Sequence, residues 1–258
     1  KLETEHNYGN PFIDVQLEAE FAGPGTIRTM EGFYDGCENG RHVWRIRFAP
    51  MKEGEWTYRI HSNHGEFDGG TGGFRCTGPV SGGGLTVNPH FPHWFAREDG
   101  SHQMICNEGW YPHPCNGFDR EYERRDFKQP GEDDMKKYLQ MLADHRVNFL
   151  LDIGQLYARQ SCITDTGFRW PWKVLDAGSN RIDRDFFNLE YYQRTDRILE
   201  FALKNDIFFG MEILYDNSLV RADEWSHHPL DVKNGGWLQD NEFGTGWGVM
   251  FDLHNEIH

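Results

Sequence analysis

The sequence predicts a multidomain β plus α/β protein, with an immunoglobulin-like β-sandwich over residues 1–88 and an α/β domain over residues 89–258. Two observations carry this prediction. In the first part of the chain, apolar and polar residues alternate with the period of a half-buried strand, and glycines separate the alternating runs. After Gly84, short apolar runs alternate with segments of helical periodicity, which is typical of parallel strands joined by helices.

The alternation is clearest over residues 13–21, where every second residue is apolar and the residues between are charged or amide-bearing. The same pattern recurs over 44–48 and 56–60. The connection 50–54 has the length and composition of a hairpin turn, so we expect these two strands to pair with each other. Weaker strand patterns lie at 27–33, 73–77 and 84–87.

The second part of the chain has three short apolar runs that read as buried strands, at 104–106, 147–153 and 207–214. Helical spacing of apolar residues predicts helices over 132–145 and 186–205. Because strand and helix alternate, the sequence predicts parallel pairing with right-handed crossovers.

Composition excludes several classes of partner. The chain carries 26 Lys and Arg against 41 Asp and Glu, a net charge of −15, which argues against nucleic acid or an anionic membrane surface. No apolar run approaches the ~18 residues of a membrane span. The five cysteines lack CxxC spacing, and the histidine pairs at 61 and 64, 90 and 93, and 227 and 228 lack a zinc motif. We therefore expect surface or loop histidines, no metal and no cofactor; the oligomeric state stays open.

Four motifs in order resemble the β-sandwich domain of unknown function that precedes apiosidase-like glycoside hydrolase barrels. They are Asn-Pro-Phe-Ile-Asp-Val at 10–15, Glu-Gly-Phe-Tyr-Asp-Gly at 31–36, Trp-Arg-Ile-Arg-Phe at 44–48 and Gly-Glu-Trp-Thr-Tyr at 54–58. The continuation is similar to the barrel family itself, with Glu-Asp-Gly at 98–100, Arg-Val-Asn at 146–148 and Tyr-Gln-Arg-Thr-Asp at 192–196.

The resemblance implies a (β/α)8 TIM barrel after the sandwich. A complete barrel needs about 250 residues, whereas roughly 170 follow the sandwich, so we expect only the first part of the barrel in this chain. The resemblance also implies a secreted, periplasmic or cell-surface protein.

Barrel enzymes hold their working residues at the carboxyl ends of the strands. The residues that follow the three predicted strands combine carboxylates and amides, which bind sugar hydroxyls, with aromatic rings, which stack on the C–H face of a sugar. The candidate substrate-binding residues are Asn107, Glu108, Trp110, Asp152, Gln155, Tyr157, Glu212 and Asp216.

Glycoside cleavage normally uses two carboxyl groups. The best single candidate is Glu256, because in related retaining barrels an Asn-Glu pair ends the fourth strand, and here Asn255 precedes Glu256. A fourth strand would need a crossover of about a dozen residues, and no helical segment of that length precedes residue 248. The alternative, in which Glu256 belongs to the approach to a third helix, stays open, and the second catalytic carboxylate is not identified.

The leading interpretation is therefore a glycoside hydrolase that acts on a plant, algal or microbial polysaccharide or oligosaccharide by a two-carboxylate retaining mechanism. The main alternative is a non-catalytic glycan-binding or cell-surface adhesion protein. A polysaccharide lyase is disfavoured, because the negative charge of this chain would repel an acidic polymer.

Overall fold

The structure is a computed structural model in which the chain divides into two compact units, Lys1–Met104 and Ile105–His258. The residues that it describes are 1–77, 83–108, 132–152, 171–176, 181–211, 222–226, 228, 230–236 and 238–239. The domain boundary predicted at residue 88 lies within the first unit, between the strand Leu85–Val87 and the strand Phe95–Arg97 of a small sheet, and stays a prediction.

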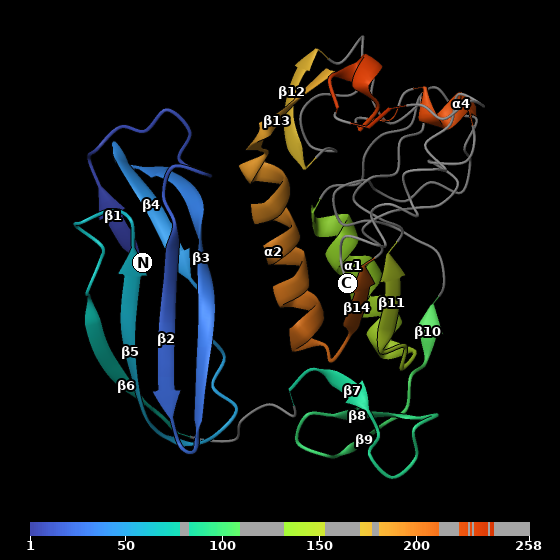
Figure 1. Cartoon of the computed structure of the whole chain (residues 1–258). Helices are drawn as coiled ribbons and strands as arrows, with labels where there is room; N and C mark the ends of the chain where they lie inside the picture. Colours follow the sequence, from blue (N-terminus) through green and yellow to red (C-terminus); the bar gives the residue numbers. More distant parts are fainter. Residues whose placement is uncertain are drawn as a thin grey trace. The chain divides into compact units, whose positions relative to one another are not determined.

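The first unit is built on one six-stranded antiparallel sheet in the order β1-β4-β3-β2-β5-β6 (Figure 1). Its strands are β1 (Leu2–Thr4), β2 (Leu17–Gly23), β3 (Thr26–Glu38), β4 (Arg41–Ile46), β5 (Gly54–Ser62) and β6 (Thr71–Cys76). The long strand β3 pairs with β2 along its first half and with β4 along its second half. One continuous sheet therefore has two halves that meet at β3, in place of the two separate sheets expected for a sandwich.

The two halves share one apolar core. Along β2, buried and exposed residues alternate as the sequence predicts. The ring of Phe48 stacks on Phe21 of β2 at a centroid distance of 4.1 Å and contacts Trp56 of β5 at 4.9 Å. The buried core consists of Val15, Leu17, Ala19, Phe21, Trp44, Trp56, Ile60 and Phe67.

The strand predicted over 13–21 begins later, at Leu17, because the preceding residues form a turn. The Asn10 side chain accepts a hydrogen bond from the Phe12 amide, and the Asp14 carboxylate accepts one from the Asn10 amide. Such Asx-type bonds compete with strand pairing. Ile13 is consequently 61% exposed.

The predicted hairpin between 44–48 and 56–60 is wrong. Strand β4 lies between β1 and β3, whereas β5 lies between β2 and β6. The segment between β4 and β5 therefore joins the two halves of the sheet. The contact of Phe48 with Trp56 stabilises this connection, and β4 and β5 do not pair with each other.

A small antiparallel sheet completes the first unit. It consists of β7 (Leu85–Val87), which confirms the strand predicted at 84–87, with β8 (Phe95–Arg97) and β9 (His102–Gln103).

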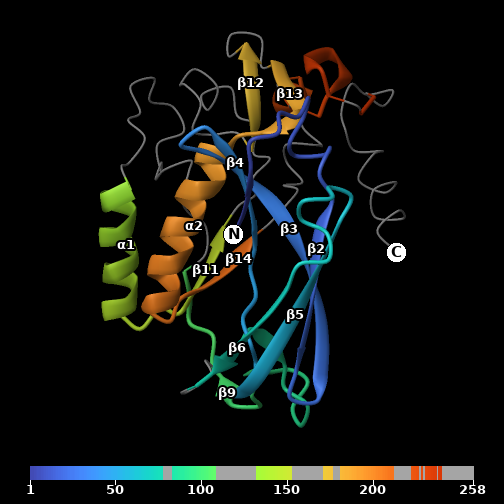
Figure 2. The same cartoon turned by 90° about the vertical axis from the view of Figure 1, so that its left-hand side faces the viewer.

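The second unit contains a parallel sheet in the order β10-β11-β14, which confirms the predicted parallel pairing for the runs 147–153 and 207–214. The buried strand predicted at 104–106 is wrong, because Met104 is 68% exposed and the strand begins only at Asn107. Its strands are β10 (Asn107–Glu108), β11 (Phe149–Asp152) and β14 (Phe208–Met211). Helices α1 (Glu132–Asp144) and α2 (Leu189–Lys204) confirm the two predicted helices and lie side by side (Figure 2). The remaining described elements are the antiparallel pair β12 (Trp172–Asp176) and β13 (Arg181–Phe187), the short helix α4 (Ala222–Trp225) and the 3-10 turn η2 (Val232–Asn234).

The two helices and the parallel sheet enclose the second core. Leu139 of α1, Ile198 of α2 and Leu150 of β11 are each fully buried in it. An ion pair also joins the helices, with the Arg197 Nε 2.8 Å from a carboxylate oxygen of Glu132. Among the described residues, no helix combines the length and the apolar character needed to cross a membrane.

The (β/α)8 TIM barrel is wrong for this structure. A closed barrel requires each strand to have two neighbours. Among the described strands, β10 and β14 pair with β11 alone, so the parallel sheet is open. The strands of the three other sheets are antiparallel, so the described chain is rich in β-structure with one small α/β layer.

Candidate functional site

The carboxyl edge of the parallel sheet is the first candidate site. Strand β10 ends at Glu108, β11 at Asp152 and β14 at Met211. Glu108 is in register with Leu150, and Asp152 is in register with Met211. Because the strands are parallel, their carboxyl ends lie at one edge of the sheet, and two acidic residues on adjacent strands are brought there.

Asn148 aligns the three strands at the opposite edge. Its side-chain oxygen accepts a hydrogen bond from the Cys106 amide at 2.8 Å, and its carbonyl oxygen accepts one from the Phe208 amide at 2.8 Å. The amide of Asn148 in turn donates to the Cys106 carbonyl at 3.1 Å. Sequence reasoning placed Asn148 only within a family motif. A side-chain amide just before a buried apolar run is the signal that could have identified this positioning role.

The structure places three of the predicted site residues. Asn107 begins β10 and is exposed, while Glu108 and Asp152 end β10 and β11. The other predicted residues, which lie outside the described part of the chain, are Trp110, Gln155, Tyr157, Glu212, Asp216 and Glu256.

Glu132 is a further carboxylate of the second unit, at the start of α1. Its hydrogen bond from the Lys136 ammonium, together with the hydrogen bond from Arg197, holds the pKa of the Glu132 carboxyl below its usual value. A carboxylate that is ionised and already engaged by two cations is poorly suited to donate a proton. Glu132 is therefore a structural residue that links the helices.

The histidines do not gather into a metal centre within the ranges that the structure describes, where no three His, Cys, Asp or Glu side chains could hold an ion. His61, His90 and His93 are exposed, in keeping with the expected surface positions. His228 differs, because it is 1% exposed and stacks on Trp225 at 5.1 Å. Its Nδ1 accepts the amide of Leu230, so this histidine belongs to a local core.

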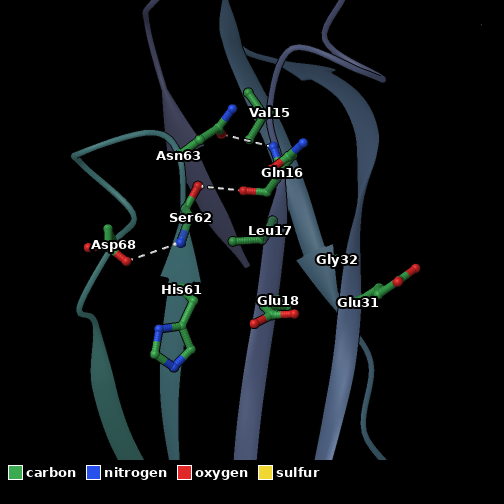
Figure 3. Close-up of a pocket in the computed structure, with 10 residues that line it drawn as sticks. All are labelled: Val15, Gln16, Leu17, Glu18, Glu31, Gly32, His61, Ser62, Asn63 and Asp68. Carbon is green, nitrogen blue, oxygen red and sulfur yellow. Dashed lines mark hydrogen bonds between the residues drawn. The ribbon is translucent and has the colours of Figure 1, made fainter.

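The second candidate site is a hollow of about 640 Å³ in the first unit, beside β2, β3 and β5 (Figure 3). We call it the β2 hollow, and its polar side chains include Gln16, Glu18, Glu31, His61 and Asp68. Sequence reasoning missed it, because Glu18 and its neighbours form the ordinary polar face of an alternating strand.

Comparisons with known proteins give a family model and a solved structure. The model of a domain of unknown function, DUF5060, matches residues 1–63, the part of the chain that holds all four motifs of the N-terminal resemblance. No curated protein matches the chain.

The solved structure is that of a "putative glycoside hydrolase" from Bacteroides vulgatus, with a TM-score of 0.63 and 23% sequence identity. The match covers 82% of this chain and 39% of the solved chain, so this chain spans about two fifths of that protein. At this identity the likeness is one of fold.

Proposed function

We propose that this protein is a glycoside hydrolase of the apiosidase-like group, which acts on a plant, algal or microbial polysaccharide or oligosaccharide. We place substrate binding at the carboxyl edge of β10, β11 and β14. The observation that supports the proposal is the strand register, which brings Glu108 and Asp152 to one edge of a parallel sheet. Ligands of open α/β sheets bind beyond the carboxyl ends of the strands.

The residue types at this edge suit a sugar. A carboxylate accepts two hydroxyl donors at once, and charge-assisted hydrogen bonds of this kind are strong. In the proposal, Glu108 and Asp152 hold hydroxyl groups while Trp110 stacks on a sugar ring. Asn107, Gln155, Tyr157, Glu212 and Asp216 complete the proposed substrate-binding set.

The proposed chemistry is retaining hydrolysis with Glu256 as acid/base. In such a reaction, the acid protonates the leaving glycosidic oxygen while a second carboxylate attacks the anomeric carbon. Water then attacks the anomeric carbon and displaces that carboxylate, while the first residue accepts a proton from the water. We further propose that the protein works outside the cytoplasm, where polysaccharides are found.

The test uses the 258-residue chain with a panel of plant, algal and microbial polysaccharides and oligosaccharides, with released reducing ends as the readout. Glu256→Gln should lower turnover by about 10²- to 10⁴-fold, the usual effect of losing a general acid. Asp152→Asn should weaken oligosaccharide binding in calorimetry by about tenfold or more, since it removes a charged acceptor.

The matched control is Glu200→Gln, which removes a carboxylate of α2 that pairs with Lys204 on the exposed helix surface. Turnover and binding should be unchanged in this variant. Release of reducing ends at equal rates by the original chain and by Glu256→Gln would refute the assigned acid. Oligosaccharide binding without turnover in any sample would favour the glycan-binding alternative.

A further inference from the structure

We propose that the β2 hollow binds a neutral, hydroxyl-rich ligand of one or two sugar rings, held by Glu18, His61 and Gln16. That the ligand is a sugar rests on the proposed function. The binding site itself rests on the geometry of the first unit and uses no residue of the parallel sheet.

The hollow exists because β3 leaves β2. The two strands pair up to Glu18 and Glu31, and from Gly32 onward β3 pairs with β4. Gly32 permits this change of partner, since a Cβ atom at this position would lie 2.5 Å from the Leu17 side chain. The fork opens a space of about 640 Å³, within the range typical of small-ligand pockets.

One wall of the hollow is held rigidly by hydrogen bonds that cross from β5 to the start of β2. Ser62 Oγ donates to the Gln16 carbonyl at 2.7 Å, and Asn63 Oδ1 accepts the Gln16 amide at 2.9 Å (Figure 3). Asp68 Oδ1 accepts the Ser62 amide at 3.1 Å. A wall that is already ordered loses little conformational entropy when a ligand binds.

Four exposed polar residues that line the hollow have side chains without a protein partner in the part of the chain that the structure describes. Among the described residues, no hydrogen bond or ion pair engages the side chains of Gln16, Glu18, Glu31 or His61. In the register of the sheet, Glu18 lies opposite Glu31 on one side and His61 on the other. Figure 3 shows Glu18 on the middle strand of this row, with the Glu31 side chain turned away from it.

Other carboxylates of the same sheet have cations opposite them. Glu20, the next outward residue of β2, is in register with Arg59, and Glu55 forms a 3.4 Å ion pair with Arg75. Like charges directly opposite each other destabilise a sheet. The row of Glu18 thus lacks the charge pairing of its neighbours at the position where the sheet is hollowed, which leaves its carboxylates available to a ligand.

The unpartnered side chains of the β2 hollow determine which chemical class of ligand fits. Carboxylates accept hydrogen bonds and donate none when ionised, so they favour a ligand that presents donors. Two carboxylates also repel anions, which excludes phosphates and uronates. The described residues hold no metal cluster here, whereas sugar hydroxyls supply several donors without charge.

The experiment titrates the 258-residue chain with neutral monosaccharides and β-1,4-linked disaccharides of glucose, mannose and xylose, followed by NMR and calorimetry. Each titration is performed in the Asp152→Asn background, which weakens the other proposed site. Glu18→Gln should weaken binding at least fivefold, and His61→Ala should have a similar effect. Glu20→Gln, on the same strand and face, is the matched control and should change affinity less than twofold.

Two readouts separate this proposal from the proposed hydrolase. Glu18→Gln in the otherwise unaltered chain should leave turnover of a short soluble substrate unchanged, and its thermal midpoint should be equal or higher because a like-charge pair is removed. If no substrate is hydrolysed but sugar binding still depends on Glu18, the hydrolase proposal fails and this one stands. No sugar binding, equal effects of Glu18→Gln and Glu20→Gln, or binding of spermidine or Ca²⁺ in place of sugar would overturn it.

Discussion

Gly23 and Gly32 occupy positions where the antiparallel sheet has no room for a side chain. A Cβ at Gly23 would lie 2.2 Å from the Trp56 ring, and Trp56 is 1% exposed. Trp56 is further held by a hydrogen bond from its Nε1 to the Lys52 carbonyl at 3.0 Å. The ring therefore cannot move aside without loss of that bond and of core contacts.

Gly23→Ala should accordingly destabilise the first unit by about 1–3 kcal/mol, the usual cost of overpacking a filled core. Chemical denaturation followed by tryptophan fluorescence measures the change. Gly65→Ala is the control, because a Cβ there meets no atom within 4 Å. Equal unfolding free energies for the two variants would contradict this account of Trp56.

At the scale of single elements, α1 and α2 act as a pair. They meet through apolar faces and through Glu132 and Arg197. The Asn188 side chain caps the start of α2 by accepting the Tyr191 amide. A side-chain cap at the start of α2 and the ion pair between Glu132 and Arg197 therefore add to the apolar contact between the helices.

Glu132 makes this contact pH-dependent. Because Lys136 and Arg197 lower the pKa of the Glu132 carboxyl below its ordinary 4.5, the ionised form stabilises the folded state. This contribution is complete above about pH 4.5 and is lost as the pH falls through the lowered pKa. Glu132→Gln should thus reduce the unfolding free energy by about 0.5–1 kcal/mol near pH 7 and leave it unchanged near pH 2.

Urea titrations of the original chain and Glu132→Gln at the two pH values provide the measurement. Glu200→Gln serves as the control, since its pair with Lys204 is exposed and lies within one helix. A difference between Glu132→Gln and the original chain that persists undiminished near pH 2 would show that the ion pair is not its cause.

At the scale of the whole molecule, the chain consists of two units with separate cores. In the described part of the structure, the buried clusters around Trp44 and around Leu139 share no residue. Each unit consequently has its own source of apolar stabilisation, the burial of side chains from its own strands or helices.

Leu139→Ala should therefore destabilise the second unit by about 2–5 kcal/mol and leave the first unit unaffected. Scanning calorimetry of the full chain should show two transitions, of which this variant lowers one. Phe21→Ala, a core substitution in the first unit, should lower the other. A single transition that both variants shift equally would refute independent unfolding.

The described elements of the candidate site were only partly predictable. The apolar run over 147–153 predicts a buried strand, and Asp152 at its end follows from that pattern. The sequence does not indicate which strands are neighbours, so the adjacency of Glu108 and Asp152 is a result of the tertiary structure. The same applies to the row of Glu31, Glu18 and His61, which come from three strands.

The sequence by itself determined the local features of this protein: strand alternation along β2, the helices α1 and α2, and parallel pairing in the second unit. These depend on periodicity and on helix-terminal charges, which are properties of neighbouring residues. Only the tertiary structure decided that β4 and β5 belong to different halves of one sheet, that β3 links those halves, and that β10 and β14 each pair with β11 alone among the described strands. The physical reason is that strand pairing is chosen by burial of distant rings such as Phe48 and Trp56, and no short window of sequence contains both partners of such a contact.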